Sequence, residues 1–146
     1  EKLAVMLSIL SINLTENLLQ SINQQYLFRL PTSLYKKEKK IEGLLKLIDN
    51  EYSKNHTQIL VDIDTMIASE ELILTLIKKG YNFVVELGDD ISKVEKVKNE
   101  LELMKYCIID KKQTDIKNMM KALPNEILEK TIKEDITKLN EIRGEN

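Results

Sequence analysis

Acidic side chains follow three of the apolar segments of this 146-residue sequence, and their types and spacing suit metal or phosphate chemistry. The candidate site residues are Asp62, Asp64, Glu86 and Asp110. Carboxylates that converge from neighbouring strand ends make an oxygen-rich site for a divalent cation such as Mg²⁺ or Mn²⁺. The sequence therefore predicts a metal or phosphoacceptor cluster at these four positions.

The same carboxylates have a second interpretation. An Asp at the end of a strand also caps the next helix or stabilises a turn, and a chain with 24 acidic residues carries many of them in loops. Three successive apolar segments end in a carboxylate, which favours a site, whereas the first segment ends in Arg29, Leu30 and Pro31. Both interpretations stay open at this point.

Four short apolar segments have the length of strands, at residues 26–30, 58–63, 82–87 and 106–110. They do not alternate apolar with polar residues, so both of their faces must be covered. Such segments are typical of a parallel sheet flanked by helices. We expect the second and third to end close to Asp64 and Glu86.

The intervals between these segments have helical periodicity. The first helix carries a stripe of apolar residues at three- and four-residue spacing: Leu3, Leu7, Leu10, Leu14, Leu18 and Ile22. Another is predicted between Ser69 as N-cap and Gly80 as C′ residue, and a capping-box spacing at Ser92 opens the next. After Pro124 a last helix is predicted over Leu128, Ile132, Ile136, Leu139 and Ile142.

This alternation predicts one α/β domain over residues 1–146, with a parallel sheet of about four strands and additional N- and C-terminal helices. The sheet is either part of a (β/α) barrel or flavodoxin-like. A complete barrel needs eight strands, so four cannot close one. The chain-end helices cover their own sheet or form a dimer surface.

The composition argues against several classes of function. The net charge of −2, with only two Arg among 22 basic residues, argues against nucleic acid as a partner. Polar residues interrupt the apolar start of the first helix, which argues against a signal peptide or membrane insertion. Cys107 is the single cysteine and lies in an apolar segment, so we expect a buried thiol without chemistry and a cytoplasmic location.

From Gln58 onward the chain resembles the central part of EAL-type cyclic-di-GMP phosphodiesterases, which are bacterial signalling domains built on a (β/α)₈ barrel. Residues 59–64 (ILVDID) resemble the LEITE strand, residues 80–87 (GYNFVVEL) the GxxIALDD stretch, and residues 104–110 (MKYCIID) the VDYLKID strand. Residues 28–31 fall where the family has VNLS, although residues 11–15 (SINLT) match those letters more closely.

The resemblance implies that three positions bind divalent metal in active members and that a lysine helps to position the attacking water. Here the metal positions read Arg29, Asp62 and Glu86, and the lysine position reads Ile108. The resemblance therefore implies a degenerate relative that does not hydrolyse cyclic-di-GMP. We expect a signalling or interaction module with a protein partner or a second copy of itself.

Two rival resemblances keep a phosphohydrolase or phosphoacceptor function open. The chain is similar to response-regulator receiver domains, in which Asp110 would be the phosphoacceptor, and residues 62–64 resemble the DxD of haloacid-dehalogenase phosphatases. Strand order separates the first two families. Sequential order favours the barrel relative, and a 2-1-3-type order favours the receiver.

Overall fold

The computed structural model describes residues 26–30, 32–51 and 57–139. They form a five-stranded sheet of β1 (Tyr26–Arg29), β2 (Thr57–Asp62), β3 (Asn82–Glu86), β4 (Tyr106–Asp110) and β5 (Thr131–Glu134). Every neighbouring pair of strands is parallel. The α/β class and the four predicted strands are confirmed, and a fifth strand is added.

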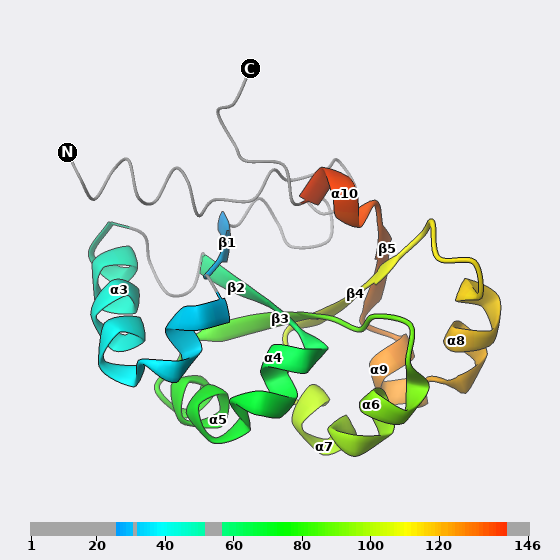
Figure 1. The fold of residues 1–146 in the computed structure, drawn as a ribbon, viewed down its shortest axis with the longest axis horizontal. Coiled ribbons are helices and arrows are strands. Elements are labelled where there is room, and N and C mark those ends of the chain that lie inside the picture. Colours follow the sequence, from blue (N-terminus) through cyan, green and yellow to red (C-terminus); the bar gives the residue numbers. More distant parts are fainter. Residues whose placement is uncertain (1–25, 31, 52–56, 140–146) are drawn as a thin grey trace.

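The helices connect successive strands and gather on one side of the sheet (Figure 1). In chain order they are η1 (Thr32–Lys36), α3 (Glu38–Glu51), α4 (Ile63–Ala68), α5 (Glu70–Lys78), α6 (Ile91–Lys96), α7 (Lys98–Leu101), α8 (Ile116–Ala122) and α9 (Asn125–Leu128). The short helix α10 (Ile136–Leu139) follows β5 on the other side of the sheet. None of the helices in the described part of the chain is both long and apolar enough to cross a membrane.

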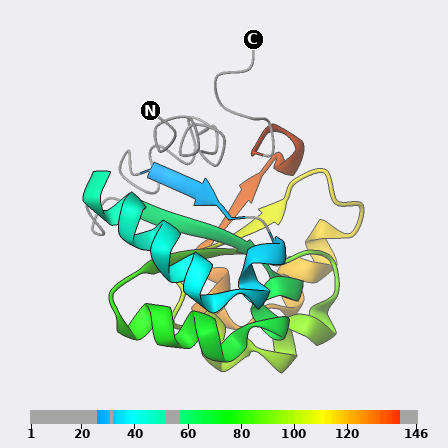
Figure 2. The same cartoon turned by 60° about the vertical axis from the view of Figure 1, so that its left-hand side comes forward.

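The strand order is β1-β2-β3-β4-β5, so each strand lies beside its neighbour in sequence. Right-handed crossovers between such strands put every connecting helix on the same face, as Figure 2 shows. Consecutive units of a (β/α) barrel have this order. A flavodoxin-like 2-1-3-4-5 order would instead place the first strand inside the sheet.

Strand β5 corrects the prediction of one continuous helix after Pro124. That helix ends at Leu128 in α9, and Thr131–Glu134 pairs in parallel with β4. The spacing of Leu128, Ile132 and Ile136 fits a helical period, but β4 offers unpaired backbone groups along its edge, and pairing with them satisfies those groups. Tertiary context therefore overrides the local helical pattern.

The face that the helices cover, called the outer face here, is apolar over most of strands β1 to β4. It carries Phe28, Ile59, Val61, Phe83, Val85, Cys107 and Ile109, all buried and packed in one cluster with η1 and helices α3 to α9. Among the helical residues of this cluster, Leu45, Ile73 and Val94 are fully buried. At roughly 25 cal/mol per Å² of apolar area removed from water, this cluster is the main source of stability.

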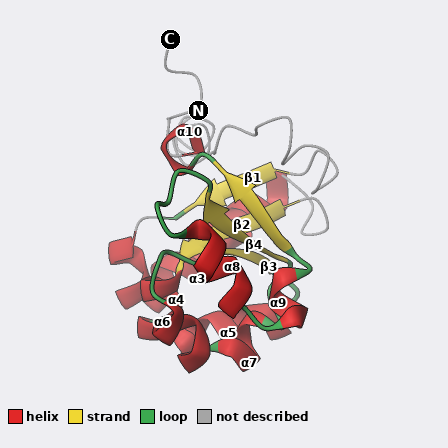
Figure 3. Cartoon of the chain, turned by 90° about the vertical axis from the view of Figure 1, so that its right-hand side faces the viewer, coloured by secondary structure: helices red, strands yellow, loops and turns green. Residues whose placement is uncertain are grey.

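The opposite face, called the inner face here, is apolar only in its middle. A smaller cluster there contains Leu27, Leu60, Val84 and Ile108, with Tyr106, Ile132 and Ile136 packed against it. Figure 3, seen along the side of the sheet, shows helices α3 to α9 gathered on the far side from α10. Because side chains alternate along a strand, the last inward position of each strand lies beyond this cluster, at the carboxyl ends of the strands.

Helix boundaries agree with the sequence signals in part. Ser69 is the N-cap residue of α5 and Gly80 follows its C-cap with a φ of 98°, as predicted. Asp90, two residues before the predicted Ser92, caps α6, and its carboxylate accepts hydrogen bonds from the Ser92 backbone N–H and hydroxyl. The predicted first helix, over residues 3–24, lies outside the described residues.

Candidate functional site

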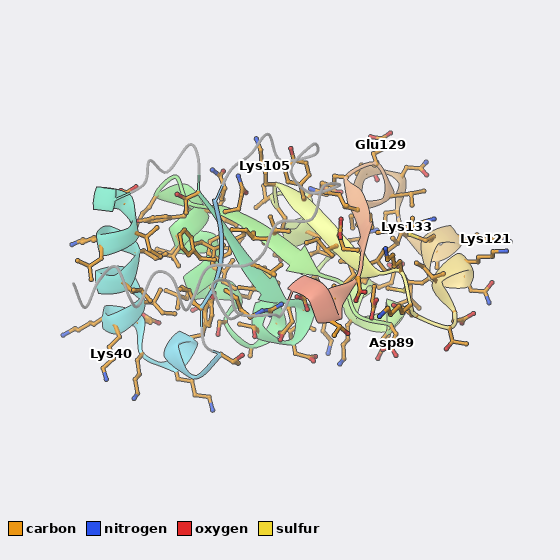
Figure 4. The ribbon with its side chains drawn as sticks, turned by 90° about the horizontal axis from the view of Figure 1, so that it is seen from above. Lys40, Asp89, Lys105, Lys121, Glu129 and Lys133 are labelled. Atoms are coloured by element: carbon orange, nitrogen blue, oxygen red, sulfur yellow. The ribbon has the colours of Figure 1, made fainter. Side chains whose placement is uncertain are left out.

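The last inward side chain of each strand is charged, and together these five side chains form what we call the strand-end rim: Arg29, Asp62, Glu86, Asp110 and Glu134. Asp62 pairs in register with Glu86, and Asp110 with Glu134. Figure 4 shows the polarity of the sheet, with Asp89 beyond the end of β3 and Lys105 before the start of β4 at opposite edges. Parallel pairing therefore brings three of the four predicted site residues to one edge.

An ion pair between Arg29 and Glu86 links the ends of β1 and β3 across β2. Nη2 of Arg29 donates to Oε1 of Glu86, and the two side chains are only 27% and 15% exposed. Burial lowers the pKa of Arg29, and the nearby Asp62 carboxylate opposes that change. The guanidinium stays charged, because arginine is not deprotonated in proteins.

Asp62 has a structural role that accounts for its position. Its Oδ1 accepts a hydrogen bond of 2.7 Å from the backbone N–H of Thr65, which makes it the N-cap residue of α4. The helix begins directly at Ile63, so the strand ends one residue after Val61. The helix-cap interpretation of this carboxylate therefore holds, and its second oxygen is free of that bond.

Tyr35 of η1 places a buried hydroxyl near the same rim. The side chain is 5% exposed, and burial raises the pKa of its phenol, while the charge of Arg29 acts in the opposite direction. Neither this hydroxyl nor Nε of Arg29 has a hydrogen-bond partner among the described residues. The sequence offers no signal for this position of Tyr35, since η1 is identified only from the structure.

The far end of the rim is built by β4, β5 and the loop that follows β4. Oδ1 of Asp110 accepts a hydrogen bond of 3.1 Å from the Lys112 backbone N–H, and Nζ of Lys112 lies 3.0 Å from Oδ2 of Asp135. Glu134 and Asp135 are 3% and 6% exposed. Neither acid was predicted as a site residue, because both fall in the helix predicted after Pro124, although β5 repeats the pattern of a strand ending in a carboxylate.

Asp64 does not belong to the rim, which corrects its predicted placement at the end of the second strand. It is the second residue of α4, its side chain is 70% exposed, and its carboxylate lies 2.7 Å from Nζ of Lys93 on α6. This exposed contact raises the pKa of Lys93 through the hydrogen bond and the charge of Asp64. The physical reason is the cap at Asp62, which starts the helix before Asp64.

The rim residues do not fit the divalent metal centre that the EAL resemblance implies. Within the described residues, no group of three or more His, Cys, Asp or Glu side chains could hold a metal ion. A guanidinium already contacts Glu86, and Arg29 cannot donate a lone pair to a metal. What this arrangement can do is hold opposite charges together and present polar groups at the edge of the sheet.

A separate cavity of about 250 Å³ lies between the loop after β3 and helix α8. Its lining combines polar and apolar side chains: Asp89, Ile91, Asp115, Asn118, Met119 and Ala122. Met119 is buried, whereas Asp89 and Asp115 are exposed. None of the rim residues lines it.

Comparison of the chain with known protein families, curated proteins and solved structures finds no match.

Proposed function

We propose that the chain is a catalytically inactive, EAL-like bacterial signalling module that acts through contacts with a protein partner or a second copy of itself. The observation that carries this proposal is the ion pair between Arg29 and Glu86. In the family that the sequence resembles, these two positions bind the metal that hydrolysis requires. Here the residue at the first of these positions, Arg29, is a cation, and it neutralises the carboxylate at the second, Glu86.

Ile108 is the second support for an inactive module. It occupies the position that the resemblance assigns to the water-positioning lysine, is fully buried, and pairs in register with Glu86. An aliphatic side chain has neither a charge nor a hydrogen-bonding atom to orient water. Ile108 therefore cannot supply the chemistry that the resemblance implies for this position.

The sheet order supports the barrel resemblance over the receiver resemblance. A receiver-type sheet has the 2-1-3-4-5 order, whereas this one runs sequentially from β1 to β5. Asp110, the phosphoacceptor in the receiver interpretation, lies on β4 of this sheet and already accepts a hydrogen bond from the Lys112 backbone. The proposal places the chain in the cytoplasm, where the free thiol of Cys107 stays reduced.

A hydrolysis assay tests the proposal. The full chain is incubated with cyclic-di-GMP and Mn²⁺ or Mg²⁺, and linear dinucleotide is measured by chromatography. We expect no product above the level without protein. Product that is lost in Asp62→Asn and kept in the exposed control Asp64→Asn would overturn the proposal.

Acetyl phosphate separates the receiver alternative from the proposed module. We expect no covalent phosphate on Asp110, measured as a mass increase of the intact chain. An increase that disappears in Asp110→Asn would favour a phosphoacceptor domain and contradict the proposal. The same reaction with Asp64→Asn controls for labelling of an exposed carboxylate.

A further inference from the structure

The cavity between the loop after β3 and helix α8 differs from the rim in the roles of its acids. At the rim, Asp62 caps α4, and Asp110 accepts a hydrogen bond from the backbone of its own loop. The two acids of the cavity, Asp89 and Asp115, do not have this kind of structural role. Asp90 caps α6 in place of Asp89, and Asp115 occupies the N-cap position of α8 without a side-chain capping bond. The local fold therefore does not account for these two carboxylates.

The two cavity acids also lack a basic partner among the described residues. Asp89 lies in the loop beyond the end of β3 (Figure 4), and its charge acts on Lys93, but Nζ of Lys93 lies 2.7 Å from the Asp64 carboxylate. Oδ1 of Asp115 accepts a hydrogen bond of 2.7 Å from Nδ2 of Asn118, which is a neutral group. The cavity therefore presents two carboxylates that no described cation neutralises by contact.

The rest of the cavity lining is apolar and continuous with the core. Met119 is buried in the larger cluster, Ile91 packs against that cluster, and Ala122 completes the lining. A hard divalent cation prefers an oxygen-rich site, which these side chains cannot supply, whereas an aliphatic chain packs well against them. The volume of about 250 Å³ is below the roughly 300–1,000 Å³ of pockets for drug-sized ligands. It suits a single long side chain or a small molecule.

We propose that this cavity binds an aliphatic cation, which is an ammonium or guanidinium group on an apolar chain. The chain packs against Ile91 and Met119, and the charged end meets the carboxylates of Asp89 and Asp115. Lysine and arginine side chains and free alkylamines share this combination of an apolar stem and a charged head. Hydrogen bonds between such a head and a carboxylate are stronger than those between neutral groups. Because the cavity shares no residue with the rim, absence of binding here would leave the proposed function untouched.

An NMR titration of the full chain with n-butylamine, which is an ammonium ion near neutral pH, tests the proposal. The backbone amide shifts of Ile91 and Asn118 are followed to saturation. n-Butanol has the same chain without a charge, and butyrate has the opposite charge, so these two are the matched control probes. We expect saturable shifts with n-butylamine alone, and weaker binding at higher salt, because salt screens the attraction of exposed carboxylates.

Four substitutions of exposed residues locate the site of binding. Asp89→Asn and Asp115→Asn should each weaken the binding of n-butylamine by roughly threefold, and the double variant by about tenfold. Glu126→Gln removes a charge on α9 outside the cavity, so it is the matched control and should bind as the wild type does. Ala122→Leu fills the cavity without a change of charge and should abolish binding. Melting temperatures confirm that each variant is folded.

Two further probes identify the source of the cation. Nα-Acetyl-lysine amide carries its ammonium on a side chain, as a partner protein would, whereas 1,4-diaminobutane is a free small molecule with an ammonium at each end. Tighter binding of the lysine derivative than of n-butylamine would assign the cavity to a basic side chain of a partner protein. Tighter binding of the diamine would assign it to a free amine. Both results support the proposed cation site.

Three results would overturn the proposal. The first is the absence of a saturable shift with n-butylamine, or an equal shift with n-butanol. The second is wild-type affinity in the double variant of Asp89 and Asp115, or in Ala122→Leu, which would place the binding outside the cavity. The third is a saturable shift of the same residues with Mg²⁺ alone and none with n-butylamine, which would make the cavity a metal site.

Discussion

The two faces of the sheet differ in where polar side chains replace apolar ones along the strands. On the outer face the apolar side chains continue to the last residues, so that Leu30, Ile63 and Leu87 beyond the strand ends are also buried. On the inner face the apolar middle gives way to the charged rim. The two faces alternate residue by residue along one strand, so one sequence pattern encodes both a core and a polar edge.

The fold and the chemistry therefore depend on separate positions of the same strands. The apolar residues of the outer face hold the helices in place, whichever residues occupy the rim. The inward residue at each strand end is free to be a metal ligand, a salt-bridge partner or a helix cap without loss of the fold.

Truncation on the outer face should have the largest effect. Phe83 is 1% exposed and lies in the centre of the larger cluster. Phe83→Ala should lower the free energy of unfolding by about 3–5 kcal/mol, through lost burial and a residual cavity. Urea denaturation measures this, and a loss below about 1 kcal/mol would contradict the assignment of this face as the main core.

Breaking the rim ion pair should have an intermediate effect. Glu86→Gln leaves the partly buried guanidinium of Arg29 without its carboxylate, and the cost should be about 1–3 kcal/mol, between the values for exposed and fully buried pairs. A double-mutant cycle with Arg29→Met isolates the pair. A coupling energy near zero in urea denaturation would show that the contact does not hold β1 to β3.

Alkaline pH should lower the free energy of unfolding, because the Cys107 thiol is buried on the outer face. Burial raises the pKa of this thiol from an ordinary value near 9.0 to about 12. The unfolded chain therefore loses its proton first, and stability should decrease as pH rises from about 9 toward 12. Between pH 8 and pH 10 the wild type should lose about 1 kcal/mol more than Cys107→Val, measured by urea denaturation. Parallel losses would contradict a buried thiol.

Removal of the helix cap at Asp62 should lower the stability by a smaller amount. Two substitutions at this position separate its structural role from a chemical one. Asp62→Ala should cost about 1 kcal/mol, because the Thr65 N–H loses its acceptor. Asp62→Asn should cost only a few tenths of a kcal/mol, since the amide oxygen still caps α4. Melting temperatures of the two variants check this, and equal losses would assign the stability to the charge instead of the cap.

The exposed pair of Asp64 and Lys93 should have the smallest effect. The Asp64 carboxylate is 70% exposed, and salt screens such contacts. Asp64→Asn should leave the melting temperature unchanged within error in 0.15 M salt. A clear decrease would mean that α4 and α6 depend on this contact, and Asp64→Asn would then no longer serve as a neutral control.

The four predicted strands were accessible from the sequence because each is a run of apolar residues with both faces buried. Strand β5 was not, because Ile132 is its only strongly apolar residue and its identity depends on the unpaired edge of β4. A short polar strand of this kind has no local signature. Its spacing with the flanking apolar residues fits a helix as well.

The positions of Asp62, Glu86 and Asp110 followed from strand ends and parallel pairing, and the structure places all three at one edge. The contact between Arg29 and Glu86 could not be predicted, since 57 residues separate them and their meeting depends on the register of β2 between them. The membership of the chain in the EAL family stays a prediction.

The most direct test of the account is the melting temperature in a titration with Mn²⁺. The wild type should show no rise, because the Arg29 guanidinium holds Glu86, whereas Arg29→Asn should gain a Mn²⁺-dependent rise by placing an amide oxygen beside Asp62 and Glu86. Arg29→Met, which removes the charge without adding a ligand oxygen, should rise less. A rise in the wild type equal to that of Arg29→Asn would show that this ion pair does not exclude a metal.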